Sequence, residues 1–132
     1  MSNPSICFLD TEFNSIDYPN QNDGIQEITE IGVVIFRNGK PAEKFSRYCQ
    51  LKDGNKLTKR CKKITGITAE TLKTQGIPFL QAMEELNQFL NKHNVEKIYA
   101  FGPADALEMR STAKLNNADA EIYQMIKKIK NI

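Results

Sequence analysis

The sequence is poor in the residue types that cross-link chains or bind transition metals. It contains no tryptophan, one histidine (His93) and three cysteines, Cys7, Cys49 and Cys61. The odd cysteine number and the absence of a C-x-x-C pair argue against a disulfide framework and a zinc knuckle, and they favour a reducing, cytoplasmic location. No apolar run approaches the length of a membrane span, and no basic segment followed by an apolar one opens the chain. Neither a transmembrane helix nor a signal peptide is therefore predicted.

Length and charge limit the classes of protein that remain. The 132 residues suffice for one domain with a hydrophobic core and leave no room for a second. The net charge of +2 does not by itself identify a nucleic-acid partner. On charge alone, the most basic run is interpreted as a solvated helix face, and it comprises Lys56, Lys59, Arg60, Lys62 and Lys63.

The first part of the chain has the pattern of three β-strands. Residues 5–9 form a short apolar run typical of a buried strand, and residues 28–36 are apolar and rich in β-branched side chains. Asn38-Gly39 follows, and both residues tolerate the positive φ of a type I′ turn, so residues 43–51 are predicted to return as an antiparallel strand. We expect a three-strand antiparallel meander, with a polar loop at residues 14–26.

From residue 57 onward the apolar spacing changes to that of helices. Residues 57–63 predict a short helix opened by Thr58, and Thr68 can cap a further helical turn. The clearest helix spans residues 78–91, because its apolar side chains recur every three or four positions on one face. Residues 97–101 are predicted to form a fourth strand.

Two segments after the fourth strand complete the pattern. Residues 104–115 are predicted to form a helix with Leu107, Ala113 and Leu115 facing inward. Residues 120–132 are predicted to form a short strand or turn that leads into an amphipathic helix. The order β-β-β-α-β-α is that of an α/β layered fold.

Two acids stand at the end of the first strand, in Leu9-Asp10-Thr11-Glu12-Phe13. Side chains two residues apart on a strand project to the same face, so Asp10 and Glu12 are expected to be neighbours. Two such carboxylates repel each other unless a cation lies between them, and oxygen ligands favour Mg²⁺ or Mn²⁺. The alternative, which an isolated D-x-E pattern favours, is a solvated pair of acids.

A third acid favours the metal-site interpretation. Asp105 follows the fourth strand and a Gly102-Pro103 turn, at the start of a helix where the helix dipole and free amide groups favour its ionised form. Ligand sites in α/β sheets lie beyond the carboxyl ends of strands, and Asp10, Glu12 and Asp105 all lie just past such ends. Helix capping is the alternative role of Asp105.

Taken together, these segments resemble the DEDD-type 3′–5′ exonuclease family, in its histidine-containing subclass on a ribonuclease H-like fold. Asp10-Thr11-Glu12 is similar to the first exonuclease motif, with residues 28–33 as its companion strand. Ile64-Thr65-Gly66-Ile67-Thr68 resembles the T-G-I segment of these enzymes, and Phe101-Gly102-Pro103-Ala104-Asp105 resembles the second motif. The three segments occur in the order of the family and run through the whole chain.

The resemblance implies a metal-dependent hydrolase that removes nucleotides from the 3′ end of single-stranded RNA or DNA with two Mg²⁺ or Mn²⁺ ions. The catalytic metal ligands that it implies are Asp10, Glu12 and Asp105. The contacts to the terminal nucleotide that it implies are Phe13, Asn14 and Ile64. Phe13 and Ile64 are equally interpretable as core residues, and Glu30 is expected to be a buried acid hydrogen-bonded near the site.

The chain departs from the family pattern at the third motif. That motif places a histidine, the general base, five residues before a last aspartate on a helix beyond the fifth strand. His93 precedes the fourth strand and has no aspartate five residues on, so it receives no catalytic role. We expect residues 1–132 to be an exonuclease domain that is incomplete at its C-terminus, with the C-terminal helical part missing and little or no activity of its own.

A second class of function stays open, namely a non-catalytic module on the same fold that binds nucleic acid or a partner protein. An actin-like phosphotransferase is excluded, because Glu12 occupies the place of the glycine in the D-x-G start of that class. Four apolar residues near the C-terminus are expected either to pack back across the sheet or to associate with another copy of the chain: Ile122, Met125, Ile126 and Ile129.

Overall fold

The structure of the protein is a computed structural model that describes residues 5–15 and 26–132. Its strands are β1 (Ser5–Ser15), β2 (Gln26–Arg37), β3 (Lys40–Cys49), β4 (Gly76–Ile77), β5 (Val95–Ala100) and β6 (Ile129–Asn131). Its helices are α1 (Lys59–Thr65), α2 (Ala69–Gln75), α3 (Phe79–Lys92), α4 (Ala104–Leu115) and α5 (Ala120–Lys127). Most of the predicted polar loop at residues 14–26 lies outside the described residues.

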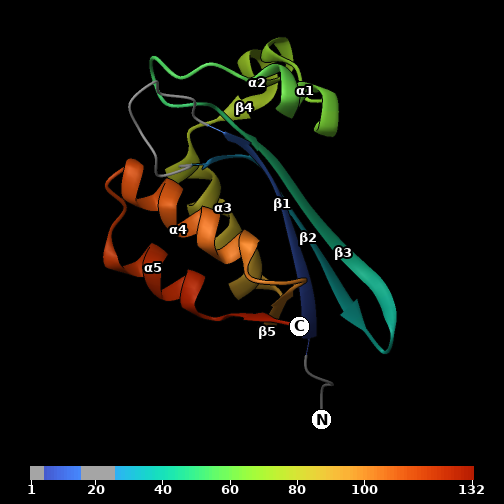
Figure 1. The fold of residues 1–132 in the computed structure, drawn as a ribbon. Helices are drawn as coiled ribbons and strands as arrows, with labels where there is room; N and C mark the ends of the chain where they lie inside the picture. Colours follow the sequence, from blue (N-terminus) through green and yellow to red (C-terminus); the bar gives the residue numbers. More distant parts are fainter. Residues whose placement is uncertain (1–4, 16–25) are drawn as a thin grey trace.

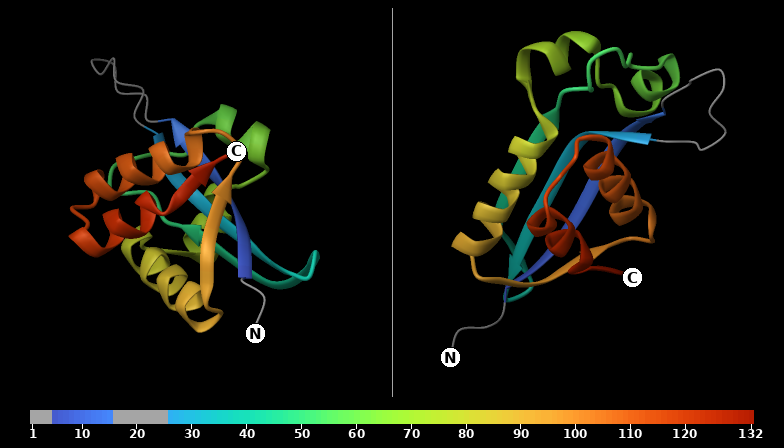
Figure 2. Two further views of the ribbon diagram at one scale, coloured as in Figure 1. Left: turned by 90° about the horizontal axis from the view of Figure 1, so that it is seen from below. Right: turned by 90° about the vertical axis from the view of Figure 1, so that its left-hand side faces the viewer.

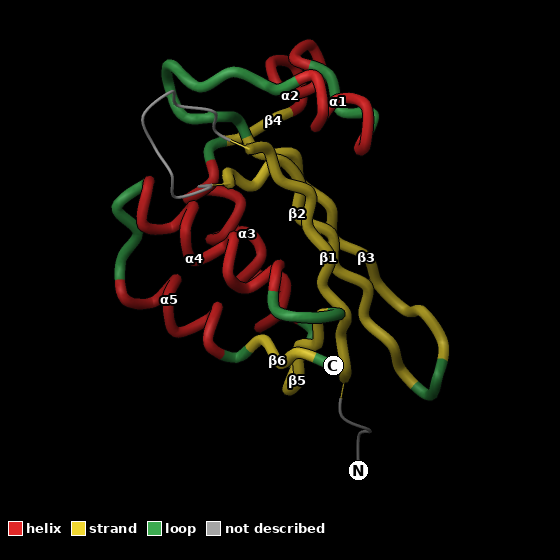
Figure 3. The backbone as a smooth tube through the Cα atoms, in the orientation of Figure 1, coloured by secondary structure: helices red, strands yellow, loops and turns green. Residues whose placement is uncertain are grey.

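The strands form one sheet in the order β4-β3-β2-β1-β5-β6. β1, β2 and β3 make the predicted antiparallel meander, while β5 runs parallel to β1 and β6 parallel to β5. Helices α3, α4 and α5 lie on one face of the sheet, and α1 and α2 lie beyond the end at which β1 finishes (Figures 1 and 2). In the described part of the chain, no helix covers the other face (Figure 3).

Local signals set several element ends as predicted. Asn38 and Gly39 have φ values of 54° and 74°, which is the left-handed backbone that the β2–β3 hairpin requires. The Thr58 hydroxyl accepts a hydrogen bond from the backbone N–H of Cys61 and caps α1. Thr68 caps α2 in the same way, through the N–H of Thr71.

The core lies between the sheet and the helices on its covered face. Helix α3 buries the stripe that its spacing predicted, and this stripe consists of Phe79, Ala82, Met83, Leu86 and Leu90. Opposite it, alternate residues of β2 point inward: Ile31, Val33 and Ile35. The two patterns interlock because a strand buries every second residue, whereas a helix buries every third or fourth.

Helix α4 has the predicted bounds, but one of its predicted inward residues is wrong. Leu107 is 52% exposed, whereas Met109, Thr112 and Ala113 are buried. The inward face is fixed by Thr112, whose hydroxyl accepts a hydrogen bond from the backbone N–H of Ile28 on β2. Residues three or four positions apart share a face, as Met109, Thr112 and Ala113 do, whereas Leu107 lies five positions before Thr112 and is turned about 140° away from it, toward solvent.

The order of elements predicted for the last segment is also wrong, since helix α5 comes first and strand β6 follows. Asp119 caps α5 by accepting from the N–H of Ile122. Met125 and Ile126 are buried, and Ile122 and Ile129 pack half-buried against the core. The segment therefore packs back on the sheet, which is one of the two predicted outcomes, and these side chains do not support self-association.

In residues 5–15 and 26–132, none of the helices is long and apolar enough to cross a membrane.

Candidate active site

The start of α4 is tied to β1 through Asp105. Its Oδ1 accepts a hydrogen bond from the backbone N–H of Thr11 at 3.0 Å and another from the Thr11 hydroxyl. Strand β5 pairs with β1 only as far as Phe8, so the N–H of Thr11 lies past the paired part of that edge and meets the carboxylate. Asp105 therefore lies beside the D-x-E segment, at the same edge of the sheet.

Asp10 and Glu12 flank the residue that binds Asp105. Thr11 is buried against the helix layer, whereas Asp10 is exposed and Glu12 half-exposed. Because side chains alternate along a strand, Asp10 and Glu12 share the face of the sheet that the described helices leave uncovered. In the β1–β2 register Glu12 stands opposite Glu30, which brings a fourth acid to that face.

Burial and mutual repulsion disfavour the ionised form of these acids. Burial, followed by the negative charge of Asp105, raises the pKa of Asp10, and a hydrogen bond from the Thr11 backbone acts in the opposite sense. Burial also raises the pKa of Glu12, with further increases from the charges of Asp10, Glu30 and Asp105. The carboxylates thus act on one another, and a cation between them would relieve the repulsion.

The donor set suits a hard divalent cation, because every donor is a carboxylate oxygen. Within residues 5–15 and 26–132, no group of three or more His, Cys, Asp or Glu side chains stands ready to hold a metal ion in the arrangement seen. Asp10 and Glu12 are exposed enough for their side chains to rotate, whereas Asp105 is held by Thr11. The residues therefore fit a divalent ion that would draw the carboxylates together as it binds.

A pocket of about 270 Å³ opens beside Glu12. It is lined by Glu12, Phe13, Gln26, Thr58, Arg60, Cys61, Ile64 and Thr65. Phe13 and Ile64, two of the three predicted nucleotide contacts, are thus brought together with a predicted metal ligand. Ile64 is 69% exposed and is not a core residue, while Phe13 packs partly against the core.

Asn14, the third predicted nucleotide contact, is fully buried and lies outside the lining of this pocket. Its Nδ2 donates to the backbone oxygen of Lys56 at 3.0 Å, and its Oδ1 accepts from the N–H of Thr58 at 2.8 Å. These bonds join the end of β1 to the start of α1. Asn14 therefore positions the helix that forms one wall of the pocket.

The buried acid near the site is Glu27, and the prediction that assigned this place to Glu30 is wrong. Glu27 is 1% exposed and accepts hydrogen bonds from the N–H of Lys52 at 2.6 Å and from Nδ2 of Asn55 at 2.9 Å. Glu30 is half-exposed, and its Oε2 lies 3.5 Å from the Ser46 hydroxyl. No two-residue period marks Glu27 in the sequence, because the β1–β2 register shifts between Glu12 and Phe13 and interrupts the alternation of β2.

His93 lies far from these acids along the sheet. It ends α3, where its Nδ1 is 3.3 Å from Nη2 of Arg37 and its ring packs against Phe89. Arg37 is at the hairpin end of β2, next to the start of β1, whereas Asp10 and Glu12 lie toward the other end. His93 is thus outside the candidate site.

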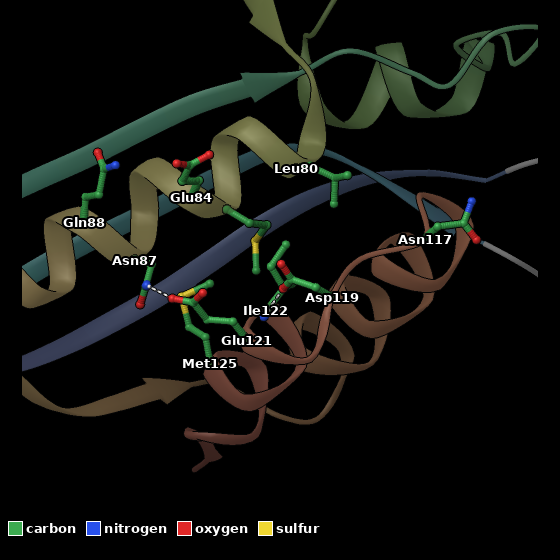
Figure 4. A pocket seen from close by; sticks show the side chains of 10 residues that line it. Leu80, Glu84, Asn87, Gln88, Asn117, Asp119, Glu121, Ile122 and Met125 are labelled. Atoms are coloured by element: carbon green, nitrogen blue, oxygen red, sulfur yellow. Dashed lines mark hydrogen bonds between the residues drawn. The ribbon is translucent and has the colours of Figure 1, made fainter.

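A second and larger hollow, of about 490 Å³, lies between α3 and α5 (Figure 4). Its walls include Glu84, Asn87 and Glu121, and Asn87 donates to Glu121 across it at 3.1 Å. It contains none of the residues that the sequence singled out for the site. The candidate site is therefore assigned by its chemistry and not by the size of the cavity.

Comparison with known proteins places this geometry in context. An exonuclease family model, RNase_T, matches residues 7–131. The chain is 31% identical over 119 residues to the probable 3′-5′ exonuclease KapD of Bacillus subtilis (strain 168), which covers 89% of this chain and 57% of KapD. The chain thus spans somewhat more than half the length of that curated relative.

Solved structures share the fold at low sequence identity. The nuclease domain of 3′hExo, a DEDDh family member bound to rAMP, superposes with a TM-score of 0.76 at 19% identity, over 87% of this chain and 60% of that one. The metal-free complex of E. coli exonuclease I with single-stranded DNA gives a TM-score of 0.71 at 15% identity, over 98% of this chain and 28% of that one. The predicted ribonuclease H-like α/β fold is confirmed.

Proposed function

Because the chain belongs to the exonuclease family that the RNase_T model describes, we propose that it supplies the acidic part of a 3′–5′ exonuclease site. The substrate is the 3′ end of a single RNA or DNA strand, and the reaction is hydrolysis of a phosphodiester bond. One observation carries the proposal: Asp105 is hydrogen-bonded to the residue between Asp10 and Glu12, so acids from distant parts of the chain meet at one edge of the sheet.

In this proposal Asp10, Glu12 and Asp105 hold Mg²⁺ or Mn²⁺. Such ions ready a water molecule for attack and steady the leaving oxygen of a phosphodiester. The chain itself contributes carboxylates that repel one another. A bound cation would relieve this repulsion, and the relief would favour binding.

The pocket beside Glu12 is proposed to receive the terminal nucleotide. Phe13 and Ile64 offer apolar surface against which a base of any identity can stack. Asn14 acts through the backbone at the start of α1, which it holds in place. Thus Phe13 and Ile64 are proposed as contact residues and Asn14 as a positioning residue.

We propose that residues 1–132 are an incomplete exonuclease domain with little or no turnover of their own. Their single histidine, His93, lies at the wrong end of the sheet, and no H-x-x-x-x-D pattern occurs in the 132 residues. Loss of a general base lowers a rate by about two to four orders of magnitude. The free, buried thiols support the further proposal of a reducing, cytoplasmic location.

A non-catalytic nucleic-acid- or partner-binding module is the second candidate. It is favoured by the absence, within the described residues, of a ready-made group of three metal-ligating side chains. A module of this kind would bind a single strand equally well with or without a divalent ion. It would gain no hydrolytic activity from an added third motif.

The test is degradation of a 5′-labelled single strand with Mg²⁺ or Mn²⁺ by two forms of the protein. The 132-residue chain should release almost no product, and a form extended by a segment with the H-x-x-x-x-D motif should shorten the strand from its 3′ end. Asp10→Ala should abolish this gain, whereas Asp53→Ala, at an exposed acid outside the site, should not. An extended form that stays inactive while both forms bind the strand would favour the binding module.

A further inference from the structure

Helix α1 concentrates positive charge beside the pocket that adjoins Glu12. It has seven residues, and its basic members are Lys59, Arg60, Lys62 and Lys63, all exposed. The helix contains no acidic residue, and the ion pair found in the described part of the chain, Arg47–Glu85, lies elsewhere. The charge of α1 is therefore not neutralised by an ion pair with any described residue.

These charges are held at a fixed place relative to the acids of β1. The α1 residue Cys61 is buried, and its Sγ lies 3.4 Å from the backbone oxygen of Phe13, to which it donates. Asn14 binds the backbone on the N-terminal side of the helix, and Thr58 caps it. Phe13 and Asn14 follow Glu12 directly in β1, so the helix is anchored next to the candidate metal ligands.

The basic residues divide between two sides of the helix. An α-helix advances by about 100° per residue, so residues three and four positions apart share a side. Arg60 and Ile64 line the pocket, and Lys63 lies three positions from Arg60 on the same side, whereas Lys59 lies between this side and that of Lys62. Lys62 projects about 200° around the helix from Arg60, away from the pocket.

We propose that the side of α1 formed by Arg60 and Lys63 binds phosphate groups of a single RNA or DNA strand, next to the nucleotide held in the pocket. The inference rests on the proposed function and deepens it by assigning a path to the strand. Surfaces that bind single strands combine cations along the backbone with apolar side chains against the bases, and Arg60 and Ile64 supply both at one pocket. The basic run is thus more than a solvated helix face.

The test is the affinity for a short 5′-fluorescein-labelled oligothymidylate, measured by fluorescence anisotropy in EDTA at several salt concentrations. The double variant Arg60→Gln/Lys63→Gln is compared with Lys62→Gln/Lys127→Gln, which removes the same charge from exposed positions off the proposed path. The slope of log K against log salt is negative, and each lost phosphate contact should reduce its magnitude by about 0.7. The first double variant should therefore lose about 1.4 in slope and bind about tenfold more weakly, and the second should match the wild type.

Three results would overturn the inference. Equal weakening in both double variants would mean that net charge and not position attracts the strand. Equal affinity for a strand with an uncharged methylphosphonate backbone would mean that phosphates are not bound. Failure of the wild-type chain to bind any strand would show that α1 forms no strand-binding surface.

The binding and hydrolysis measurements together distinguish failure of this inference from failure of the proposed function. Strand binding that depends on Arg60 and Lys63, together with an extended form that never hydrolyses, would contradict only the exonuclease proposal. Hydrolysis by the extended form with binding indifferent to α1 would contradict only the proposed strand path. Circular dichroism of each variant checks that the fold is intact.

Discussion

Asp105 and Thr11 lie 94 positions apart in the chain, and the Asp105 carboxylate accepts hydrogen bonds from both the backbone N–H and the hydroxyl of Thr11. This pair joins the start of α4 to the strand that carries Asp10 and Glu12. The middle residue of the D-x-E segment is thus part of the site, because it sets where the third acid stands. Its role does not follow from the metal-ligand pattern, in which only the outer residues count.

Removing the Thr11 hydroxyl should destabilise the fold measurably. Thr11→Val keeps the size of the buried side chain but leaves Asp105 with one bond from Thr11 instead of two. A hydrogen bond to a charged group contributes about 1.5–3 kcal/mol, so the free energy of unfolding should fall by that order. Urea denaturation measures the change, and Thr11→Ser, which retains the hydroxyl, should recover most of it. A valine variant as stable as the wild type would show that the hydroxyl contributes nothing.

Glu108 should make stability depend on pH. Its side chain is buried on α4, its Oε2 has no hydrogen-bond partner among the described residues, and burial raises its pKa. A carboxyl group whose pKa is raised by folding stabilises the fold below its unfolded pKa and loses this contribution as pH rises through the folded pKa. Glu108→Gln should therefore be more stable than the wild type at neutral pH and should lose that advantage below about pH 4, near the ordinary pKa of glutamate.

Thermal unfolding of both proteins across this pH range measures the effect. Glu96→Gln, at an exposed position on β5, is the control for the substitution itself. An advantage for Glu108→Gln that is largest in acid would contradict the assignment, because the sign would then be reversed.

The three thiols should be unreactive while the protein is folded. Burial raises the pKa of Cys7 and of Cys49 to about 12, and it also raises the pKa of Cys61. Because the thiolate is the reacting form, modification by DTNB at pH 8 should proceed only as the protein opens, and all three should react at once in urea. Fast reaction of Cys61 alone would show that α1 detaches from β1, which the proposed strand path does not allow.

The nucleotide pocket can be tested at its most exposed member. Ile64→Ala should leave the free energy of unfolding within about 0.5 kcal/mol of the wild type, because the side chain is mostly in solvent. It should weaken binding of a single strand by less than the about 1–3 kcal/mol per base of aromatic stacking, since isoleucine offers the base an aliphatic contact only. Leu80→Ala, at an exposed leucine of α3, is the matched control for anisotropy titration. Equal affinities in both variants would remove Ile64 from the site.

The sequence predicted those elements whose signals are local. Asn38-Gly39 can form the hairpin by its own backbone preferences, and Thr58 caps α1 whatever packs around it. The order of α5 and β6 was not predictable in this way. A three-residue strand carries almost no periodic signal, and β6 forms because its backbone pairs with β5.

The sequence predicted that three acids would lie close together, but not how each neighbouring side chain is placed. D-x-E and the strand–turn–aspartate pattern identified Asp10, Glu12 and Asp105, and adjacency of β1 and β5 brings them to one edge. Asn14 was expected to touch a nucleotide and is instead buried against the segment that starts α1, because tertiary contacts decide which polar side chains are covered. Glu27 was missed, since its partners, Lys52 and Asn55, are distant in sequence.

The central claim is that Asp10, Glu12 and Asp105 together take up a divalent cation. Anomalous scattering from crystals of the 132-residue chain, grown with Mn²⁺ and a nucleoside monophosphate, tests it most directly. We predict a manganese peak between the carboxylates of Asp10 and Glu12, within bonding distance of an oxygen of each and with Asp105 beside it. Bound manganese elsewhere on the protein, with none at these carboxylates, would contradict the claim.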